Sequence, residues 1–130
     1  MDNVEVGLVG EKERLVTEAD TAESLGSGSV AVFGTPALVA LMEGAAVSAV
    51  ASRLEAGTTT VGTRMDVRHL AATPVGMNVR ARAELVEVDG RRLQFHVEAW
   101  DDAEPIGEAT HERFVVDAES FVDRTEAKRS

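Results

Sequence analysis

The stretch from Pro36 to Val47 is almost entirely apolar and carries one charged residue, Glu43. Thr35 and Pro36 are typical of a helix start, because threonine is a favourable N-cap and the missing N–H of proline costs nothing in the first turn. We expect the helix to end at Gly57. A helix that is apolar on nearly all sides is stable in water only if the rest of the chain covers it. The sequence therefore predicts one long core helix wrapped by the remaining elements.

After the helix, the apolar residues recur at every second position, which is typical of strands. Strands are expected at 58–67, 79–85, 93–99 and 106–116, with a weak strand before Ala22. Asp89-Gly90 predicts a type I′ hairpin between two of them. A weak strand, a helix and a meander of strands form an α+β order, and a strongly curved antiparallel sheet is the natural wrapper for the helix. This combination describes a hot-dog fold.

The length and charge of the chain limit its possible partners. At 130 residues it is expected to form a single domain, with 125–130 as a frayed tail. A net charge of -10 argues against nucleic acid, and Glu43 interrupts the apolar run that could otherwise suggest a membrane span. The acidic N-terminus has no signal-like pattern and the chain has no cysteine, so we expect a cytoplasmic protein. The uncovered edge strand of a curved sheet predicts a homodimer.

Glu43 is the strongest candidate for a chemical role. An ionised carboxylate removed from water costs several kcal/mol unless partners compensate for it. The expected partners lie in residues 34–36 and 67–76, which contain Thr35 and His69. His69 has an ordinary pKa near ~6.5 and is a natural general base. Thr35 could be an N-cap only, a nucleophile, or a ligand for the attacking water, and Glu43 itself could attack a carbonyl or stabilise the imidazolium.

These residues stand in segments that resemble the hot-dog thioesterase family typified by fluoroacetyl-CoA thioesterase. The segments are Thr-Pro-Ala-Leu-Val-Ala-Leu-Met-Glu-Gly-Ala from Thr35, Val-Gly-Thr-Arg-Met-Asp-Val-Arg-His from Val61, Gly-Arg-Arg-Leu from Gly90, and Gly-Glu-Ala-Thr-His-Glu-Arg from Gly107. The resemblance implies an acyl-CoA thioesterase with a Thr35, Glu43 and His69 site and no cofactor or metal. It also implies that Gly62 offers its backbone N–H to the thioester carbonyl and that Arg113 lies near the pocket.

The chain departs from that family in one segment. The family carries phenylalanines before the catalytic threonine, which form a lid over a very small acyl group, whereas this chain has Gly-Ser-Gly-Ser-Val-Ala-Val at 26–32. We therefore expect a short or medium acyl group without strict selection for the fluorinated one. The alternatives are a hot-dog hydratase or dehydratase, which needs a different His/Asp arrangement, and a non-catalytic acyl-CoA-binding or scaffold protein.

Two further groups of side chains have competing interpretations. His111 lies beside Glu112 and Arg113 and is interpreted as structural, and His96 as a solvated outer residue. Four strand arginines are either ordinary outward residues or a patch for the phosphates of coenzyme A; they are Arg64, Arg68, Arg80 and Arg82.

Overall fold

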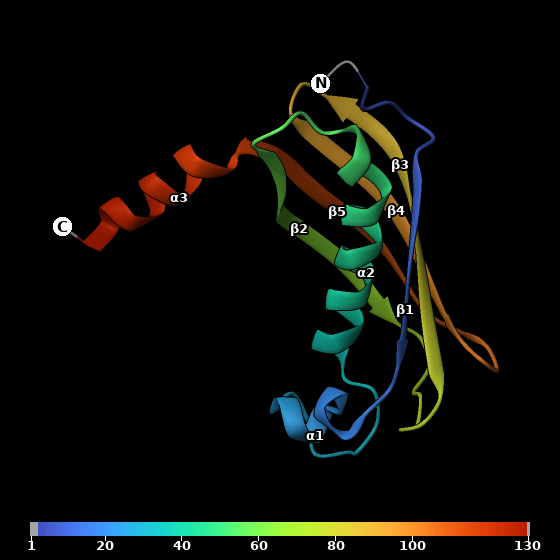
Figure 1. Ribbon diagram of the computed structural model, residues 1–130. Coiled ribbons are helices and arrows are strands. Elements are labelled where there is room, and N and C mark those ends of the chain that lie inside the picture. The colour runs from blue at the N-terminus through green and yellow to red at the C-terminus, as the bar shows by residue number, and fades with distance from the viewer. Residues whose placement is uncertain (1–2, 130) are drawn as a thin grey trace.

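An antiparallel sheet curves around the long helix α2 in the computed structural model, which describes residues 3–129 (Figure 1). The sheet has five strands in the order β1-β3-β4-β5-β2, and every neighbouring pair is antiparallel. This arrangement confirms the predicted hot-dog fold. The elements are β1 (Val9–Leu15), α1 (Ala22–Leu25), α2 (Thr35–Val50), β2 (Thr58–His69), β3 (Asn78–Asp89), β4 (Arg92–Asp101), β5 (Pro105–Asp117) and α3 (Ala118–Glu126), with short 3-10 turns at Glu18–Asp20, Ala51–Arg53 and Ala127–Arg129.

The core forms where α2 meets the concave face of the sheet. Leu38 and Met42 of α2 are fully buried, and burying side chains of this size contributes about 1.5–3 kcal/mol each. The inward positions of β3 and β4 alternate as the sequence predicts; they are Val79, Ala81, Ala83 and Leu85, then Leu93, Phe95, Val97 and Ala99. Residues 35–53 are long and apolar enough to cross a membrane, but the packing of α2 against the sheet is that of a core helix.

The backbone of β1 packs directly against the backbone of α2 at Gly10. A Cβ built on Gly10 would lie 2.3 Å from the carbonyl oxygen of Ala45 and 2.3 Å from the backbone nitrogen of Ala49. Both atoms belong to the backbone and cannot give way cheaply. Gly10 therefore sets how closely β1 and α2 approach, and any side chain there would push the strand off the helix.

Three predicted details at element ends differ from the structure. The N-cap of α2 is Gly34, so Thr35 is the first helical residue and its side chain is left for another contact. The helix ends at Val50 and continues only as a 3-10 turn, because the chain must turn before β2. The two-residue hairpin turn begins at Gly90, one residue later than predicted. Gly90 has φ 60° and no described non-glycine residue has a positive φ, which fits a type II′ turn and excludes type I′.

The C-terminal segment is helical where a frayed tail was expected. Asp117 caps α3 by accepting a hydrogen bond from the Ser120 backbone N–H at 2.9 Å, and residues 127–129 continue as a 3-10 turn. The polar composition of the segment concealed this capped helix. Figure 1 shows α3 projecting away from the body of the domain, beyond the end of β5. The last residue of the predicted tail, 130, lies outside the described residues.

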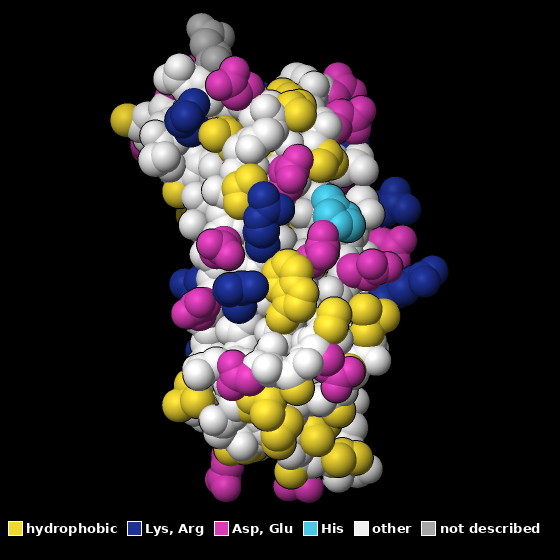
Figure 2. Space-filling model, turned by 90° about the vertical axis from the view of Figure 1, so that its right-hand side faces the viewer, with side chains coloured by type: hydrophobic (Ala, Val, Ile, Leu, Met, Phe, Trp, Pro, Cys, Tyr) yellow, Lys and Arg dark blue, Asp and Glu magenta, His cyan; other side chains and the backbone are white. Residues whose placement is uncertain are grey.

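The sheet has two edges with different surroundings. Within residues 3–129, β1 pairs only with β3 and β2 pairs only with β5. Strand β2 is the longer edge, and α2 packs mainly against β1 and β3, away from it. The face on the right-hand side of Figure 1, which is shown in Figure 2, carries basic and acidic side chains intermixed with hydrophobic ones, without a large area of one sign of charge. The free edge of β2 is thus the surface that the predicted pairing with a second copy would use.

Candidate active site

The start of α2 and the end of β2 bring Thr35 and His69 together. The Oγ1 atom of Thr35 lies 2.8 Å from Nδ1 of His69, a hydrogen-bond distance. Gly34 already caps the helix, so the Thr35 hydroxyl is free to serve this contact. The sequence prediction that these two residues share a site is consistent with this geometry.

Partial burial favours the neutral form of the His69 imidazole. Desolvation lowers the pKa of His69 from its ordinary 6.5, and an interaction with the Ala71 backbone only partly opposes this shift. The Nε2 atom is enclosed and makes no hydrogen bond with the described residues. A neutral imidazole whose Nδ1 faces a hydroxyl can accept the proton of that hydroxyl or of a water beside it.

The Thr35–His69 pair lies in a hollow of about 400 Å³. Its walls come from three segments: the region of α1, the residues that lead into α2, and the loop after β2. The lining side chains besides the pair are small or apolar; they are Ala22, Ser27, Val32, Phe33, Leu70, Ala71 and Ala72. Segment 26–32, which the sequence predicts to form no aromatic lid, contributes only Ser27 and Val32 to the lining of the hollow. Its size and apolar walls suit a small acyl group beside a polar reacting pair.

Glu43 lies in a second group of side chains, further along α2. Its Oε2 accepts a hydrogen bond from Nη1 of Arg113 at 3.0 Å. This corrects the sequence prediction, which sought the partner of Glu43 in residues 34–36 and 67–76. It also corrects the expected burial, because 40% of the Glu43 side chain is exposed whereas only 8% of the Arg113 side chain is.

Gly62 makes room for this ion pair. A Cβ on Gly62 would lie 2.7 Å from Oε2 of Glu43 and 3.2 Å from Nη1 of Arg113. Gly62 and Arg113 are also register partners in the β2–β5 ladder. The glycine therefore has a local steric reason, which the strand pattern alone could not reveal.

Two residues that sequence reasoning did not place in the site hold Arg113. Thr60 accepts twice, through Oγ1 from Nε at 2.8 Å and through its carbonyl oxygen from Nη2 at 3.1 Å. His111 Nε2 lies 3.1 Å from Nη1 of Arg113. A signal for Thr60 was its inward position in a strand, and the signal for His111 was its two-residue spacing from Arg113, which puts both on one face of β5.

The predicted site residues thus form two groups within one chain. Thr35 and Glu43 are eight residues apart on one helix, which corresponds to about 12 Å along its axis. Glu43 is directed to Arg113, and Thr35 to His69. The chain by itself does not assemble the three predicted catalytic residues around one point.

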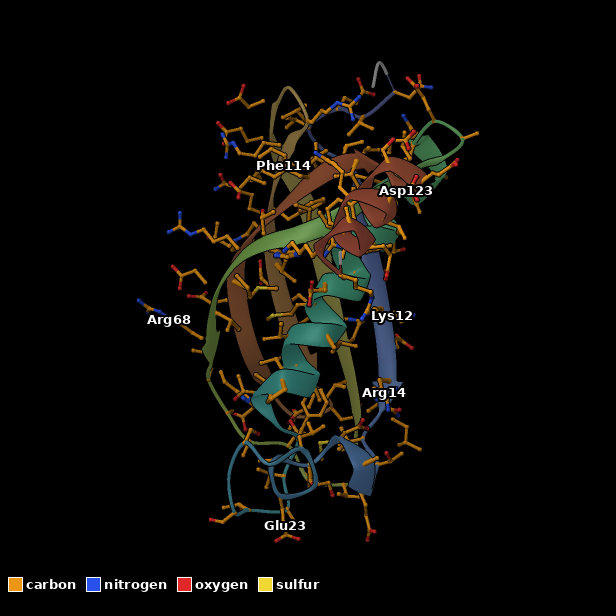
Figure 3. All side chains as sticks on the ribbon, turned by 90° about the vertical axis from the view of Figure 1, so that its left-hand side faces the viewer. Lys12, Arg14, Glu23, Arg68, Phe114 and Asp123 are labelled. Atoms are coloured by element: carbon orange, nitrogen blue, oxygen red, sulfur yellow. The ribbon has the colours of Figure 1, made fainter. Side chains whose placement is uncertain are left out.

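The four strand arginines do not form one phosphate-binding patch. Arg64 and Arg68 belong to β2, and two strands separate β2 from β3, which carries the other two. Arg80 approaches Glu11 at 3.8 Å and lies 5.2 Å from the ring centroid of Trp100. Figure 3 shows Arg68 directed outward from β2, away from α2, while Lys12 and Arg14 of β1 lie on the other side of the helix. The interpretation as separate outward residues fits better.

Comparison with known proteins identifies relatives of this chain. The family model for fluoroacetyl-CoA-specific thioesterases matches residues 16–119. A fluoroacetyl-CoA thioesterase of Streptantibioticus cattleyicolor is 49% identical over 90 residues, which make up 69% of this chain and 65% of that protein, just under two thirds of its length.

Solved structures agree with this relationship. A mutant of the fluoroacetyl-CoA-specific thioesterase FlK superposes with a TM-score of 0.91 at 38% identity, covering 98% of this chain and 99% of that one. A Thermus thermophilus protein described as a thioesterase superfamily member superposes with a TM-score of 0.87 at 28% identity, covering 98% and 97% of the two chains.

Proposed function

The chain belongs to the fluoroacetyl-CoA-specific thioesterase family, and on this premise we propose that it hydrolyses the thioester of a short or medium acyl-CoA with Thr35, Glu43 and His69 as catalytic residues. The observation that carries the proposal is the 2.8 Å contact between Thr35 Oγ1 and His69 Nδ1. The pair supplies a hydroxyl and a neutral base inside a hollow sized for a small acyl group.

The chemistry begins with a proton transfer to His69. The imidazole accepts the proton of the Thr35 hydroxyl, or of a water held by it, and the oxygen attacks the thioester carbonyl. The carbon–sulfur bond breaks, and the imidazolium returns its proton to the departing thiolate of coenzyme A. If Thr35 attacks, a water then hydrolyses its ester: His69 accepts a proton from the water, the water oxygen attacks the ester carbonyl, the bond from the acyl carbon to Thr35 Oγ1 breaks, and the imidazolium returns the proton to Oγ1 as the free acid leaves. Glu43 is the weaker candidate for the nucleophile, because Arg113 already binds one of its carboxylate oxygens.

We further propose that Glu43 acts on the Thr35–His69 pair of a second copy in a homodimer. Support comes from the two separate groups in one chain and from the free edge of β2, which carries both Gly62 and His69. If two β2 edges pair antiparallel about an axis between Met65 and Asp66, His69 of one copy lies opposite Gly62 of the other. That register brings the Glu43 carboxylate toward the partner copy's reacting pair, where it can orient the water or stabilise the imidazolium.

A free-thiol release assay with acyl-CoA substrates tests the function. Wild-type protein is expected to release coenzyme A, and Glu43→Gln and His69→Ala are each expected to lower kcat by at least ~10²-fold with the fold intact. Wild-type turnover in either variant would remove that residue from the site. Binding of acyl-CoA without any release would favour the non-catalytic alternative.

A mixed dimer tests whether the site is shared between copies. Thr35→Ala and Glu43→Gln chains carrying different affinity tags are co-expressed, and the heterodimer is isolated with both tags. A shared site leaves one of the two sites fully wild type, so the heterodimer should recover about half of the wild-type kcat. A site within one chain leaves a mutation in both sites, and the heterodimer would then be as inactive as the two homodimer controls.

We also propose that the enzyme is cytoplasmic and needs no metal ion. The proposed proton transfers use only the chain's own residues and water. Retention of activity after dialysis against a chelator is the expected result. Loss of activity that is restored by a divalent cation would contradict this part of the proposal.

A further inference from the structure

His111 lies behind the Glu43–Arg113 pair and is enclosed by the fold, with 1% of its surface exposed. Its two ring nitrogens have different partners: Nδ1 lies 2.7 Å from the carbonyl oxygen of Arg64, and Nε2 lies 3.1 Å from Nη1 of Arg113. We propose that His111 is a positioning residue that holds the guanidinium of Arg113 against Glu43, and that an irregularity in β2 holds His111 in turn. This inference rests on the proposed function of Glu43.

The irregularity in β2 supplies the partner of Nδ1. The register of β2 against β5 shifts between Gly62 and Arg64, so Thr63 is the extra residue of a β-bulge. A bulge bends its strand and redirects the backbone groups beside it. Here the Arg64 carbonyl reaches the imidazole of His111, although Arg64 is paired with Glu112 in the ladder.

The contact with this carbonyl determines where the ring carries its proton. A carbonyl oxygen can only accept, so Nδ1 must donate, and Nε2 of the neutral ring must then be an acceptor. Arg113 has no acceptor atoms, so its Nη1 donates to that Nε2. The bulge therefore selects the tautomer that can bind Arg113.

The hydrogen atoms of Arg113 account for the geometry of the pair. Nη1 carries two hydrogens, and it has two acceptors, Glu43 Oε2 at 3.0 Å and His111 Nε2 at 3.1 Å. The other two nitrogens are anchored on Thr60. With all three nitrogens engaged, the guanidinium has no other orientation that keeps its bonds, and one oxygen of the Glu43 carboxylate is left for chemistry.

Protonation of His111 would break this arrangement. An added proton on Nε2 would face the donor Nη1 and would place a second positive charge beside Arg113. Burial is the largest effect and lowers the pKa of His111 below its ordinary 6.5. The Arg64 carbonyl, Glu43 and Glu112 favour protonation and oppose this shift, whereas the positive charge of Arg113 adds to it. The ring thus remains an acceptor at neutral pH.

A series of variants at position 111 separates positioning from packing. Gln can place an acceptor oxygen near the Nε2 position, Asn can place a donor near the Nδ1 position, and Leu fills the space beside Phe95 without either group. We expect His111→Gln to keep kcat within about 3-fold of wild type, and His111→Asn and His111→Leu to lower it by about 10-fold or more with little change in KM. Equal activity of the Gln and Asn variants at equal thermal stability would overturn the proposal.

Combination with Arg113→Lys gives a second readout. Lysine lacks the forked geometry that His111 orients, so on this background His111→Asn should lower kcat by less than about 2-fold further. A full additional loss of about 10-fold would show that His111 acts independently of Arg113 and would contradict the inference.

The tautomer can be checked without any turnover. In ¹⁵N NMR spectra of the intact protein, His111 should show a protonated Nδ1 and an unprotonated Nε2 at pH 7, and Arg113→Lys should shift the Nε2 signal. An Nε2-protonated ring would overturn the proposal even if the protein is a thioesterase. Conversely, a wild-type protein that cleaves no acyl-CoA but shows the expected tautomer would fail only the proposed function.

Discussion

Gly62→Ala is the substitution whose effect can be worked out most directly from the structure. The new methyl group would meet Oε2 of Glu43 at 2.7 Å, and ordinary contact begins at 3.4 Å, so the carboxylate has to retreat by about 0.7 Å. We expect a displacement of this size to disrupt the 3.0 Å contact between Oε2 of Glu43 and Nη1 of Arg113. The closest clash is with the end of a side chain that is 40% exposed and can move without the backbone. Nη1 of Arg113, 3.2 Å from the new methyl group, must also give by a few tenths of an ångström.

The same change should affect stability and catalysis very differently. Alanine in place of a strand glycine gains about 0.5–1 kcal/mol from the unfolded state. Loss of a partly exposed ion pair costs about 1 kcal/mol or less. The two nearly cancel, and Tm should move by only a few degrees, since 1 kcal/mol corresponds to roughly 4–8 °C in a domain slightly smaller than this. A misplaced Glu43 should lower kcat by about 10²-fold, which is about 2.7 kcal/mol of barrier.

Gly44→Ala is the matched control, because Gly44 adjoins Glu43 but faces Lys12 of β1. Its added Cβ would lie 3.4 Å from Lys12 Cγ, an ordinary contact, and alanine is about 1 kcal/mol better than glycine inside a helix. We expect Gly44→Ala to raise Tm and leave kcat unchanged. Thermal unfolding and thiol release are measured on both variants. Wild-type kcat in Gly62→Ala would refute the reasoning, because the position of Glu43 would then not matter.

Further predictions concern pH and substrate range. Burial lowers the pKa of both His69 and His111 from 6.5, so below pH 6.5 the unfolded chain binds more protons than the folded one. Tm should therefore fall as the pH drops through that range, and it should fall less in His111→Gln. A Tm independent of pH between 7 and 5 would contradict this. The acid limb of kcat/KM should lie below pH 6.5, because His69 must be neutral to act as the base, and a limb above pH 7 would exclude it. Residues 26–32 contain no aromatic side chain, so kcat/KM for fluoroacetyl-CoA should exceed that for acetyl-CoA by less than about 100-fold. Butyryl- and hexanoyl-CoA should also be cleaved. Sharp selection for the fluorinated substrate would show that other residues form a lid.

The fold was predictable because its signals are local and repeated. The spacing of apolar residues in the helix and in each strand predicts which side chains are buried. In β3 and β4 every side chain predicted to face inward is buried. The ends of elements were less predictable, because caps and turns depend on one residue each. Gly34 rather than Thr35 caps α2, and α3 is a capped helix in a segment whose polar composition suggested a tail.

The sequence singled out candidate site residues but did not predict their contacts. Glu43 was singled out by its charge in an apolar helix, but its partner Arg113 lies 70 residues further along the chain. No periodicity within one segment reports a contact between a helix and a distant strand. The same limit applies to His111, whose partner is a backbone carbonyl redirected by a bulge. A glycine within a strand, such as Gly62, can mark a bulge, but it does not show which side chain the carbonyl will contact.

The separation of Thr35 from Glu43 leads to a prediction about assembly. The two residues share one helix, so the spacing of about 12 Å along its axis is set by the backbone and cannot be closed by side-chain motion. In the proposed Thr-Glu-His mechanism, the carboxylate that acts on a thioester bound beside Thr35 must therefore come from elsewhere, and the free edge of β2 is where a second copy can bring one. Light scattering at micromolar concentration should give the mass of a dimer. On dilution, specific activity should fall in step with the dimer fraction, because forming the interface and completing the site are then the same event. Full specific activity in a monomer would show that one chain suffices and that Glu43 acts without a partner.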